Sequence, residues 1–242
     1  MDIRGSVALV TGANRGLGRA FVDALLEAGA SRVYAGARDP TTIGDPRVDP
    51  VRLDVTSSYD VSRAAERCPD VTLLVNNAGI MLSTPMMAAT AADAMRREMD
   101  VNVFGLHAMI QAFAPVLKRN GGGGIINMLS VVSWFTAPFN ATYCAAKHAA
   151  LSVSDAARME LRSQGTQVTG VYAGFIDTDM VVSIDEPKTP PVQVATRAIG
   201  GLGAGEDHVL ADAPAEQVWR DVRSDPRAFE RSLQDVWDKR QN

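Results

Sequence analysis

The most informative part of this sequence is Thr11-Gly12-Ala13-Asn14-Arg15-Gly16-Leu17-Gly18. It follows a short apolar run at residues 7–10 and precedes a segment with apolar residues at three- and four-residue spacing, which ends at Gly29. Glycines between a strand and a helix allow the main chain to approach a pyrophosphate closely, and the helix N-terminus offers free N–H groups to the anion. Glycines can also be simple tight-turn residues, so this stretch alone leaves nucleotide binding open.

The rest of the chain repeats this alternation of short apolar runs and longer segments of helical period. Further strands are predicted at residues 32–37, 51–53, 71–75, 125–129, 168–172 and 208–210. Further helices are predicted at residues 59–67, 91–118, 143–162 and 192–198, and the glycines at 121–124 are predicted as a loop. This order is typical of an α/β fold, in which βαβ units form a parallel sheet covered by helices.

Length and composition indicate one domain. The chain has 242 residues, of which 46% are hydrophobic and 21% charged, as in ordinary globular proteins. We expect a single domain over residues 1–242, with residues 180–191 as a short substrate loop and residues 213–242 as a helical C-terminal tail.

Charge and cysteine content exclude several classes of protein. A net charge of −4 argues against nucleic-acid binding. The two cysteines, Cys68 and Cys144, lack metal-ligand spacing, which predicts no metal site and a reducing, cytoplasmic location. The N-terminal residues lack a leader pattern and no uninterrupted apolar run approaches the roughly 18 residues of a membrane span, so we expect no membrane association.

The end of the second predicted strand bears on the choice of nicotinamide cofactor. About 20 residues beyond the glycines, where NAD-binding folds place an acid on the ribose 2′-hydroxyl, this chain has Arg38. Arg38 and Arg15 can hydrogen-bond and neutralise a 2′-phosphate, which predicts NADP(H). Both arginines could instead be solvated surface residues, and Asp39 could turn inward and favour NAD.

A second pattern, Tyr143-x-x-x-Lys147, is preceded by Ser130. Residues four apart on a helix share a face, so the phenol and the ammonium can meet in one cleft. A neighbouring cation favours the phenolate, so we expect Lys147 to lower the pKa of Tyr143 toward neutrality, as a catalytic acid or base requires. The spacing alone is common on solvated helices. The positions of these residues in the predicted fold favour a catalytic role, because Ser130 and Tyr143 both fall near the carboxyl edge of the sheet, where open α/β folds bind ligands.

Together with other short motifs, these residues resemble the short-chain dehydrogenase/reductase family over roughly residues 5–180. The motifs are the glycine stretch, Asp54-Val55, Asn76-Asn77-Ala78-Gly79, Asn102, Ser130, Tyr143, Lys147 and Gly174-Phe175-Ile176-Asp177-Thr178. Their joint order and spacing are far more specific than any one motif. The resemblance implies a Rossmann-type, doubly wound parallel sheet of about seven strands in the order 3-2-1-4-5-6-7, with helices on both faces.

The resemblance also implies roles for the catalytic residues. Ser130 would hold the substrate oxygen, and Tyr143 would donate its proton as hydride arrives from the nicotinamide. Lys147 would bind the nicotinamide ribose, and Asn102 would anchor a water that links Lys147 to solvent.

The cofactor site is implied in the same way. Asp54 and Val55 would contact the adenine, and Ile176 and Thr178 would fix the nicotinamide carboxamide. The full set of implied cofactor contacts is Gly12, Asn14, Arg15, Gly16, Leu17, Gly18, Arg38, Asp54, Val55, Asn76, Ala78, Gly79, Tyr143, Lys147, Gly174, Ile176 and Thr178.

The implied activity is reversible, NADPH-dependent reduction of a ketone or aldehyde, a small-molecule substrate. The alternatives are NAD-linked oxidation of a hydroxyl on a sugar, steroid or polyketide, and a regulator that senses NADP without turnover. Ala173 stands where the family usually has proline before Gly174, which predicts a looser turn. The family's assemblies pack through the C-terminal region, which implies a homodimer or homotetramer, although residues 208–212 differ here from the usual glycine-rich ending.

Other residues are interpreted as packing or as pocket wall. Cys144 points away from the Tyr143 face and is expected to be buried or half-buried, and His107 and His148 are interpreted as packing residues. The pairs Met81-Leu82, Met86-Met87 and Trp134-Phe135 follow strands four and five, so they could line an apolar substrate pocket, with core packing as the alternative.

Overall fold

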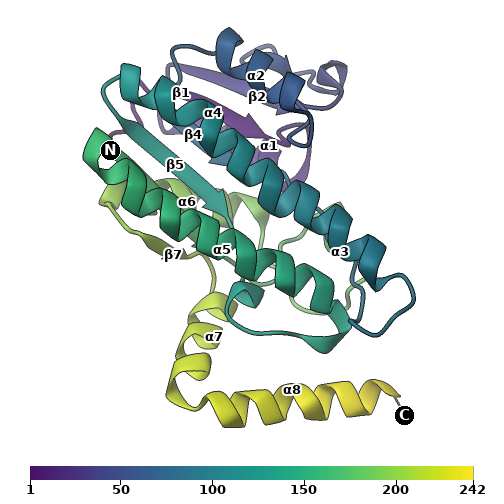
Figure 1. Cartoon of the computed structure of the whole chain (residues 1–242). Coiled ribbons are helices and arrows are strands. Elements are labelled where there is room, and N and C mark those ends of the chain that lie inside the picture. Colours follow the sequence, from purple (N-terminus) through teal and green to yellow (C-terminus); the bar gives the residue numbers. More distant parts are fainter. Residues whose placement is uncertain (242) are drawn as a thin grey trace.

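Seven parallel strands form the central sheet in the order β3-β2-β1-β4-β5-β6-β7 (Figure 1). The strands are β1 (Val7–Thr11), β2 (Arg32–Ala37), β3 (Asp49–Arg52), β4 (Leu73–Asn76), β5 (Gly123–Met128), β6 (Thr166–Tyr172) and β7 (His208–Leu210). The computed structural model describes residues 1–241, and it confirms the predicted strand order and the single Rossmann-like domain.

Helices cover both faces of the sheet. They are α1 (Gly16–Glu27), α2 (Ser58–Arg67), α3 (Ala91–Met99), α4 (Leu106–Arg119), α5 (Ala141–Leu161), α6 (Pro191–Ala204), α7 (Ala213–Ser224) and α8 (Pro226–Gln241). The helices α2, α4 and α5 pack on one face, and α1 and α6 on the other (Figure 1).

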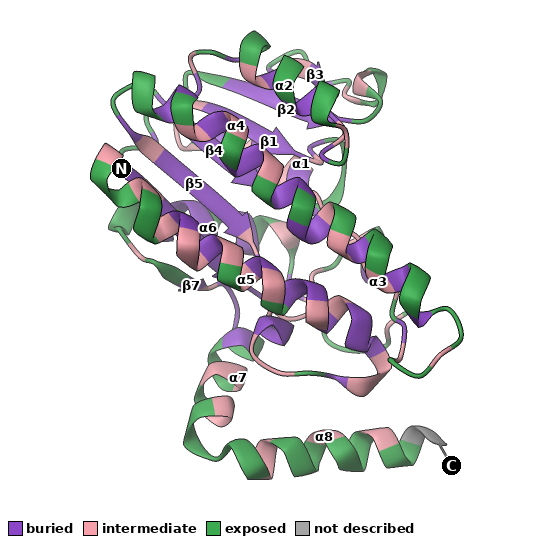
Figure 2. Cartoon of the chain, viewed as in Figure 1, coloured by how far each residue is buried: buried purple, intermediate pink, exposed green. Residues whose placement is uncertain are grey.

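The central strands are buried on both sides. In β1, Leu9 belongs to the core on the α4 side, whereas Ala8 and Val10 belong to the core on the α1 side. Figure 2 shows the same pattern, with buried residues along the sheet and on the inner surfaces of the helices. Continuous apolar strands are what a parallel sheet covered on both faces requires.

The predicted helix at residues 91–118 is not one regular helix, and that prediction is wrong at its centre. A π-helical segment, Asp100–Gly105, separates α3 from α4. The side chain of Asn102 binds the main chain of Ile80 twice: its Oδ1 accepts from the N–H at 2.9 Å, and its Nδ2 donates to the carbonyl at 2.8 Å. These tertiary bonds hold Asn102 inward, and π segments of this kind are frequent at functional sites.

Two other boundaries differ from expectation. Gly123 and Gly124 begin β5 and are not part of a loop, because they pair with Thr166 and Gln167 of β6. Helix α6 continues to Ala204, and Leu202 near its end is fully buried. The stretch Ala91–Arg119 has 29 residues, is long enough to cross a membrane and reaches a mean hydropathy of 1.2, and here it packs against α2 and α5 as core helices do.

The last two helices, α7 and α8, form an arm that extends beyond the sheet (Figure 1). We call this pair the C-terminal arm. Trp219 of α7 meets Trp134 edge-on, with ring centroids 4.7 Å apart, and Phe229 of α8 meets Phe135 edge-on at 5.0 Å. The arm therefore packs on the segment between Ser130 and α5. Asn242, the last residue of the expected tail, lies outside the described residues.

Candidate active site

The carboxyl ends of β1, β4, β5 and β6 lie at one edge of the sheet, because these neighbouring strands run parallel. Each end is followed by one of the predicted motifs: the glycine stretch after β1, residues 76–79 around the end of β4, Ser130 after β5, and residues 174–178 after β6. The topology thus brings together motifs that are far apart in sequence, as the strand order predicted.

The glycine stretch between β1 and α1 fits a pyrophosphate. A Cβ atom on Gly18 would lie 2.0 Å from the carbonyl oxygen of Gly12, and Gly12 has a φ of +65°, so both positions require glycine. Arg15 at the N-cap of α1 makes no side-chain cap bond, and the first turn has no acidic residue, which leaves its N–H groups to an anion. Asn14 is exposed here, whereas the Leu17 side chain is buried, so Leu17 can contact a cofactor only through its main chain.

Two further residues lock this loop to the end of β4, and sequence reasoning did not single them out. The Thr11 hydroxyl accepts hydrogen bonds of 2.9 Å from the N–H groups of Asn77 and Ala78. The Asn77 amide donates to the carbonyls of Thr11 at 3.0 Å and Gly12 at 3.3 Å. The signal for both was present in the sequence, since each adjoins residues of a recognised motif. Their bonds fix the glycine loop against the residues that follow β4.

Asp39, the residue that could have favoured NAD, is engaged locally. Its Oδ1 accepts from the N–H of Thr41 at 3.0 Å and from the Thr41 hydroxyl at 2.6 Å, and these bonds lower its pKa. Arg38 is exposed at the end of β2. The guanidinium of Arg38 is therefore exposed at the end of β2, whereas the neighbouring Asp39 carboxylate is hydrogen-bonded within its own turn.

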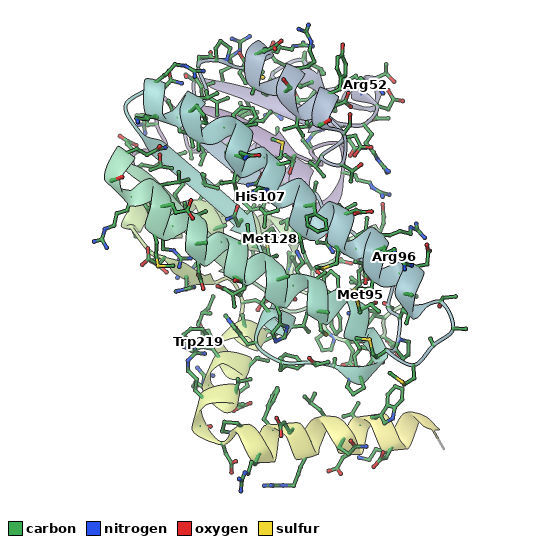
Figure 3. The ribbon with its side chains drawn as sticks, in the orientation of Figure 1. Arg52, Met95, Arg96, His107, Met128 and Trp219 are labelled. Atoms are coloured by element: carbon green, nitrogen blue, oxygen red, sulfur yellow. The ribbon has the colours of Figure 1, made fainter. Side chains whose placement is uncertain are left out.

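Asp54 and a second arginine border the same region. Asp54 accepts from the N–H and hydroxyl of Thr56 at 2.9 and 2.7 Å. Burial raises the pKa of Asp54, but these bonds and the charges of Arg38 and Arg52 outweigh it and lower the pKa overall. Arg52, at the end of β3 (Figure 3), is a basic residue that sequence reasoning missed. Val55 packs its side chain against Gly105, which leaves its main chain for an adenine contact.

Arg15 lies elsewhere than expected. Its Nη1 is 3.0 Å from Oδ2 of Asp179, in an ion pair whose side chains are 70% and 76% exposed. A Cβ atom on Gly16 would lie 3.2 Å from Cγ2 of Thr178, so the start of α1 and the turn after β6 approach each other. Exposed ion pairs of this kind contribute little and exchange readily, which leaves Arg15 available to an anion.

Ser130, Tyr143 and Lys147 converge at this edge. The side chain of Ser130 lies close enough to Tyr143 to lower the pKa of the phenol. Lys147 is 6% exposed, its Nζ lies 5.6 Å from the centroid of the Tyr143 ring, and it donates at 2.9 Å to the carbonyl of Met128 at the end of β5 (Figure 3). A hydroxyl, a phenol and an ammonium thus share one cleft.

The pKa of Tyr143 does not follow expectation, and this prediction is corrected. Burial raises the pKa of Tyr143, the charges of Cys144 and Glu98 raise it further, and the Ser130 hydrogen bond lowers it only in part. Burial also lowers the pKa of Lys147 to about 8. The Lys147 ammonium, which donates to the Met128 carbonyl, does not offset the desolvation of the phenolate form. The phenol is therefore protonated at neutral pH, and its raised pKa makes it a weaker acid in this structure than the pattern predicts.

A small cavity of about 10 Å³ borders Lys147 and has room for about one water molecule. Thr11, Asn76, Ala78, Asn102 and Lys147 are among its lining residues. In the part of the chain that the structure describes, Oδ1 of Asn76 is buried without a hydrogen-bond partner, whereas its Nδ2 donates to Asn127 at 2.9 Å. Both side-chain groups of Asn102 bind Ile80, so an expected water contact would come from its main chain.

The turn after β6 and the remaining motif residues are also at this edge. A Cβ atom on Gly79 would lie 3.0 Å from Oδ1 of Asn102. Ile176 forms an isolated bridge with Thr189, which closes the loop that contains Thr178. The N–H of Gly174 donates a hydrogen bond to the carboxylate of Asp212, which follows β7. The sequence did not predict this contact.

The apolar pairs after β4 and β5 are only partly buried. Met81, Leu82, Trp134 and Phe135 are half-buried, and Met87 is 89% exposed. Trp134 and Phe135 pack against Trp219 and Phe229 of the C-terminal arm. Met81 and Leu82 remain partly exposed, which fits a pocket wall for the pair after β4 alone.

The interpretation of His107 and His148 as packing residues is wrong. Both are exposed, His107 on the outer surface of α4 (Figure 3) and His148 on α5. Helical spacing alone does not say which face of a helix packs on the sheet. In α4 and α5 it is the face opposite the histidines. Cys144 is fully buried, as expected.

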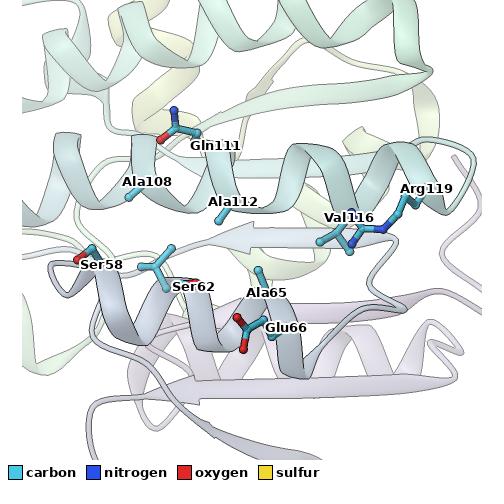
Figure 4. Close-up of a pocket in the computed structure, with 10 residues that line it drawn as sticks. Ser58, Ser62, Ala65, Glu66, Ala108, Gln111, Ala112, Val116 and Arg119 are labelled. Carbon is cyan, nitrogen blue, oxygen red and sulfur yellow. The ribbon is translucent and has the colours of Figure 1, made fainter.

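A larger hollow lies away from these residues. It measures about 450 Å³ and opens between α2 and α4 (Figure 4). Its lining residues are Ser58, Val61, Ser62, Ala65, Glu66, Ala108, Gln111, Ala112, Val116 and Arg119. None of these is a predicted site residue. Among residues 1–241, no group of three or more His, Cys, Asp or Glu side chains could hold a metal ion.

A parallel sheet with this glycine loop and this polar cleft at its carboxyl edge defines an oxidoreductase that uses a nicotinamide cofactor. The family model described as short chain dehydrogenase matches residues 6–189. The chain belongs to the short-chain dehydrogenase/reductase family, as the resemblance predicted.

Known proteins agree with this assignment. A crystal structure of a short chain dehydrogenase from Burkholderia cenocepacia in complex with NADP is similar, with 42% identity, a TM-score of 0.93 and coverage of 96% of this chain and 99% of that one. The 3alpha-hydroxysteroid dehydrogenase of Mediterraneibacter gnavus is 30% identical over 86% of this chain and 88% of its own length. The farnesol dehydrogenase of Aedes aegypti is 32% identical over 73% of this chain and 80% of its own length.

Proposed function

We propose that this protein is an NADPH-dependent oxidoreductase that reversibly reduces a ketone or aldehyde to an alcohol, with Tyr143 as the proton donor. The observation that carries the proposal is the convergence of Ser130, Tyr143 and Lys147 in one cleft. Reduction of a carbonyl requires a proton donor near the oxygen that becomes negative.

The chain's own residues have distinct tasks in this reaction. NADPH, when bound, supplies the hydride. Ser130 and Tyr143, which lie close together, both direct a hydroxyl to the carbonyl oxygen of the substrate. Tyr143 then gives up its proton to that oxygen. Lys147 is buried beside it, and its ammonium stabilises the phenolate that remains.

The preference for NADP(H) rests on the arginines at the adenosine end. Arg38 is exposed at the end of β2, Arg52 follows on β3, and Asp39 is engaged by Thr41. A 2′-phosphate would gain charge-assisted hydrogen bonds there, whereas the Asp39 carboxylate is bonded to Thr41. The NADP complex of the relative from Burkholderia cenocepacia supports the same choice.

The substrate side of the cleft favours an apolar molecule. Half-buried Met81 and Leu82 follow β4 next to the polar residues. Relatives that carry the names of steroid and farnesol dehydrogenases are consistent with an apolar alcohol or ketone. The alternative, NAD-linked oxidation of a sugar, steroid or polyketide hydroxyl, differs in cofactor and direction, and the engaged Asp39 counts against it.

The decisive test is Tyr143→Phe, assayed by NADPH absorbance against a panel of apolar ketones and alcohols. We expect turnover to fall by about 10²- to 10⁴-fold with unchanged cofactor affinity, since the variant removes only the proton donor. Tyr59→Phe is the matched control, because Tyr59 is 72% exposed on α2. Retained turnover in Tyr143→Phe would overturn the mechanism. A wild-type protein that binds NADPH but converts no member of the panel would instead support an NADP-sensing regulator.

A further inference from the structure

The turn after β6 is held by a residue that follows the neighbouring strand, β7. The N–H of Gly174 donates to Asp212, at 3.0 Å to Oδ2 and 3.3 Å to Oδ1. Asp212 is 5% exposed and follows β7. The family motif that implies nicotinamide contacts at Ile176 and Thr178 begins at Gly174. We call residues 174–178 the nicotinamide turn, and the Asp212 carboxylate accepts a hydrogen bond from its first residue.

The same carboxylate closes the far end of that loop. Oδ2 of Asp212 accepts from the Thr189 hydroxyl at 2.9 Å. Thr189 in turn donates its N–H to the carbonyl of Phe175 at 2.8 Å and accepts from the N–H of Asp177 at 3.0 Å. One buried side chain therefore ties together both ends of the segment that contains Ile176.

Asp212 also begins the C-terminal arm. Its Oδ1 accepts from the N–H of Ala215 at 2.8 Å, which makes Asp212 the N-cap of α7. The first turn of α7 packs directly on the nicotinamide turn, since a Cβ atom on Gly174 would lie 2.9 Å from Cβ of Pro214. The arm and the turn are thus one packed unit, with the carboxylate at their junction.

We propose that Asp212 is the positioning residue of the nicotinamide turn, and that it makes the start of the C-terminal arm part of the cofactor site. Ala173 lacks the fixed φ that a proline would give this turn. Asp212 supplies the missing constraint through tertiary hydrogen bonds, which are strong because the acceptor is a carboxylate. The inference rests on the proposed function only in that the turn receives the nicotinamide end of the cofactor.

The chemistry of the contacts predicts which substitution is informative. Both carboxylate oxygens of Asp212 accept hydrogen bonds, so an NH₂ group in place of either oxygen would face a hydrogen-bond donor. Asp212→Asn keeps the size of the side chain and loses one acceptor, and Thr189→Val removes a single bond without touching the cap of α7. The matched control is Asp225→Asn: Asp225 is exposed, and it accepts from the N–H of Ala228 at 2.9 Å at the start of α8.

The test is calorimetric binding of two probes to each full-length variant. One probe is NADP⁺, and the other is 2′-phospho-ADP-ribose, which lacks the nicotinamide. We expect Asp212→Asn to weaken NADP⁺ binding by about tenfold or more and to leave 2′-phospho-ADP-ribose within twofold of wild type. Thr189→Val should shift NADP⁺ in the same direction by less, and Asp225→Asn should match wild type with both probes.

The outcomes separate this inference from the proposed function. Wild-type protein that binds neither probe would overturn the proposed cofactor site itself. Equal losses for both probes in Asp212→Asn or Thr189→Val, or no loss for either, would overturn the role of Asp212. If Asp212→Asn does not fold, Thr189→Val alone decides, because the hydroxyl it removes lies outside the cap of α7.

Discussion

The ammonium of Lys147 donates a 2.9 Å hydrogen bond to the carbonyl oxygen of Met128, the last residue of β5. This bond joins α5 to the strand that leads into Ser130, so the two elements that carry the proposed catalytic side chains are fixed to each other at the cleft. It also keeps the ammonium buried, where a charge is poorly solvated.

The buried ammonium predicts a pH-dependent stability difference. Burial lowers the pKa of Lys147 from 10.5 to about 8. Between these values the unfolded chain binds more protons at this position than the folded chain, so the contribution of Lys147 to stability rises as pH increases from about 8 to 10.5. We expect the urea midpoint of Lys147→Met to decline relative to wild type across this window. Lys118→Met, at an exposed residue of α4, is the control and should show no such trend. A constant difference for Lys147→Met would refute the prediction.

The adenosine end predicts cofactor discrimination. Arg38→Ala removes an exposed guanidinium at the end of β2, so we expect the Kd for NADPH to rise by about 10- to 100-fold while the Kd for NADH changes little. Arg52→Ala should act in the same direction with a smaller effect, since Arg52 is also 3.6 Å from Asp60. Arg227→Ala, at an exposed residue of α8, is the control. Equal losses with both cofactors, or a wild-type preference for NADH, would contradict the assignment.

The π-helical segment predicts that Asn102 matters to both stability and turnover. Asn102→Ala leaves the N–H and carbonyl of Ile80 without their partners, which should lower the free energy of unfolding by about 2 kcal/mol. We also expect turnover to fall, because the segment borders the cavity next to Lys147. Asn120→Ala is the control: the side chain of Asn120 also makes two hydrogen bonds to the main chain, from Nδ2 to the carbonyls of Pro69 and Val71 at 3.0 and 2.9 Å, but at the C-terminal end of α4, away from the cleft. Comparable losses of turnover in the two variants would remove the special role of Asn102.

The C-terminal arm predicts the order of the segment after Ser130. Trp134 lies between Tyr172, stacked at 4.2 Å, and Trp219, edge-on at 4.7 Å. Trp219→Ala removes one side of this contact, so amide hydrogen exchange at residues 131–137 should become faster while exchange in the glycine loop stays unchanged. Val236→Ser, at a residue of α8 that is 44% exposed, should leave both regions as in wild type. If exchange in both regions speeds up equally in Trp219→Ala, the arm acts on global stability alone.

Several features followed directly from the sequence because they depend on local chemistry. Glycine is needed at Gly12 for a positive φ and at Gly18 for close approach, and both needs show as glycines at a strand-to-helix boundary. The apolar runs and helical periods predicted a parallel sheet covered by helices, and the family resemblance implied its strand order. The positions of the motifs after the strands predicted that Ser130, Tyr143 and Lys147 would meet.

Other features could not be read from local patterns. Helical periodicity cannot say which face of α4 or α5 meets the sheet, so His107 and His148 were placed inside when both are exposed. The direction of the Tyr143 pKa depends on burial, which outweighs the neighbouring cation only once the cleft is formed. The π-helical segment at Asn102 is accompanied by hydrogen bonds to Ile80, 22 residues earlier in the chain, which local periodicity does not predict.

By itself, then, the sequence determined the family, the topology and the identity of the residues at the cleft, because these depend on glycine geometry, periodicity and motif order. Only the tertiary structure decided how those residues are held. Asp212 reaches Gly174 across 38 positions, and Lys147 reaches Met128 across 19. Such contacts join separate strands and helices, and they exist only when burial brings distant segments within hydrogen-bonding distance.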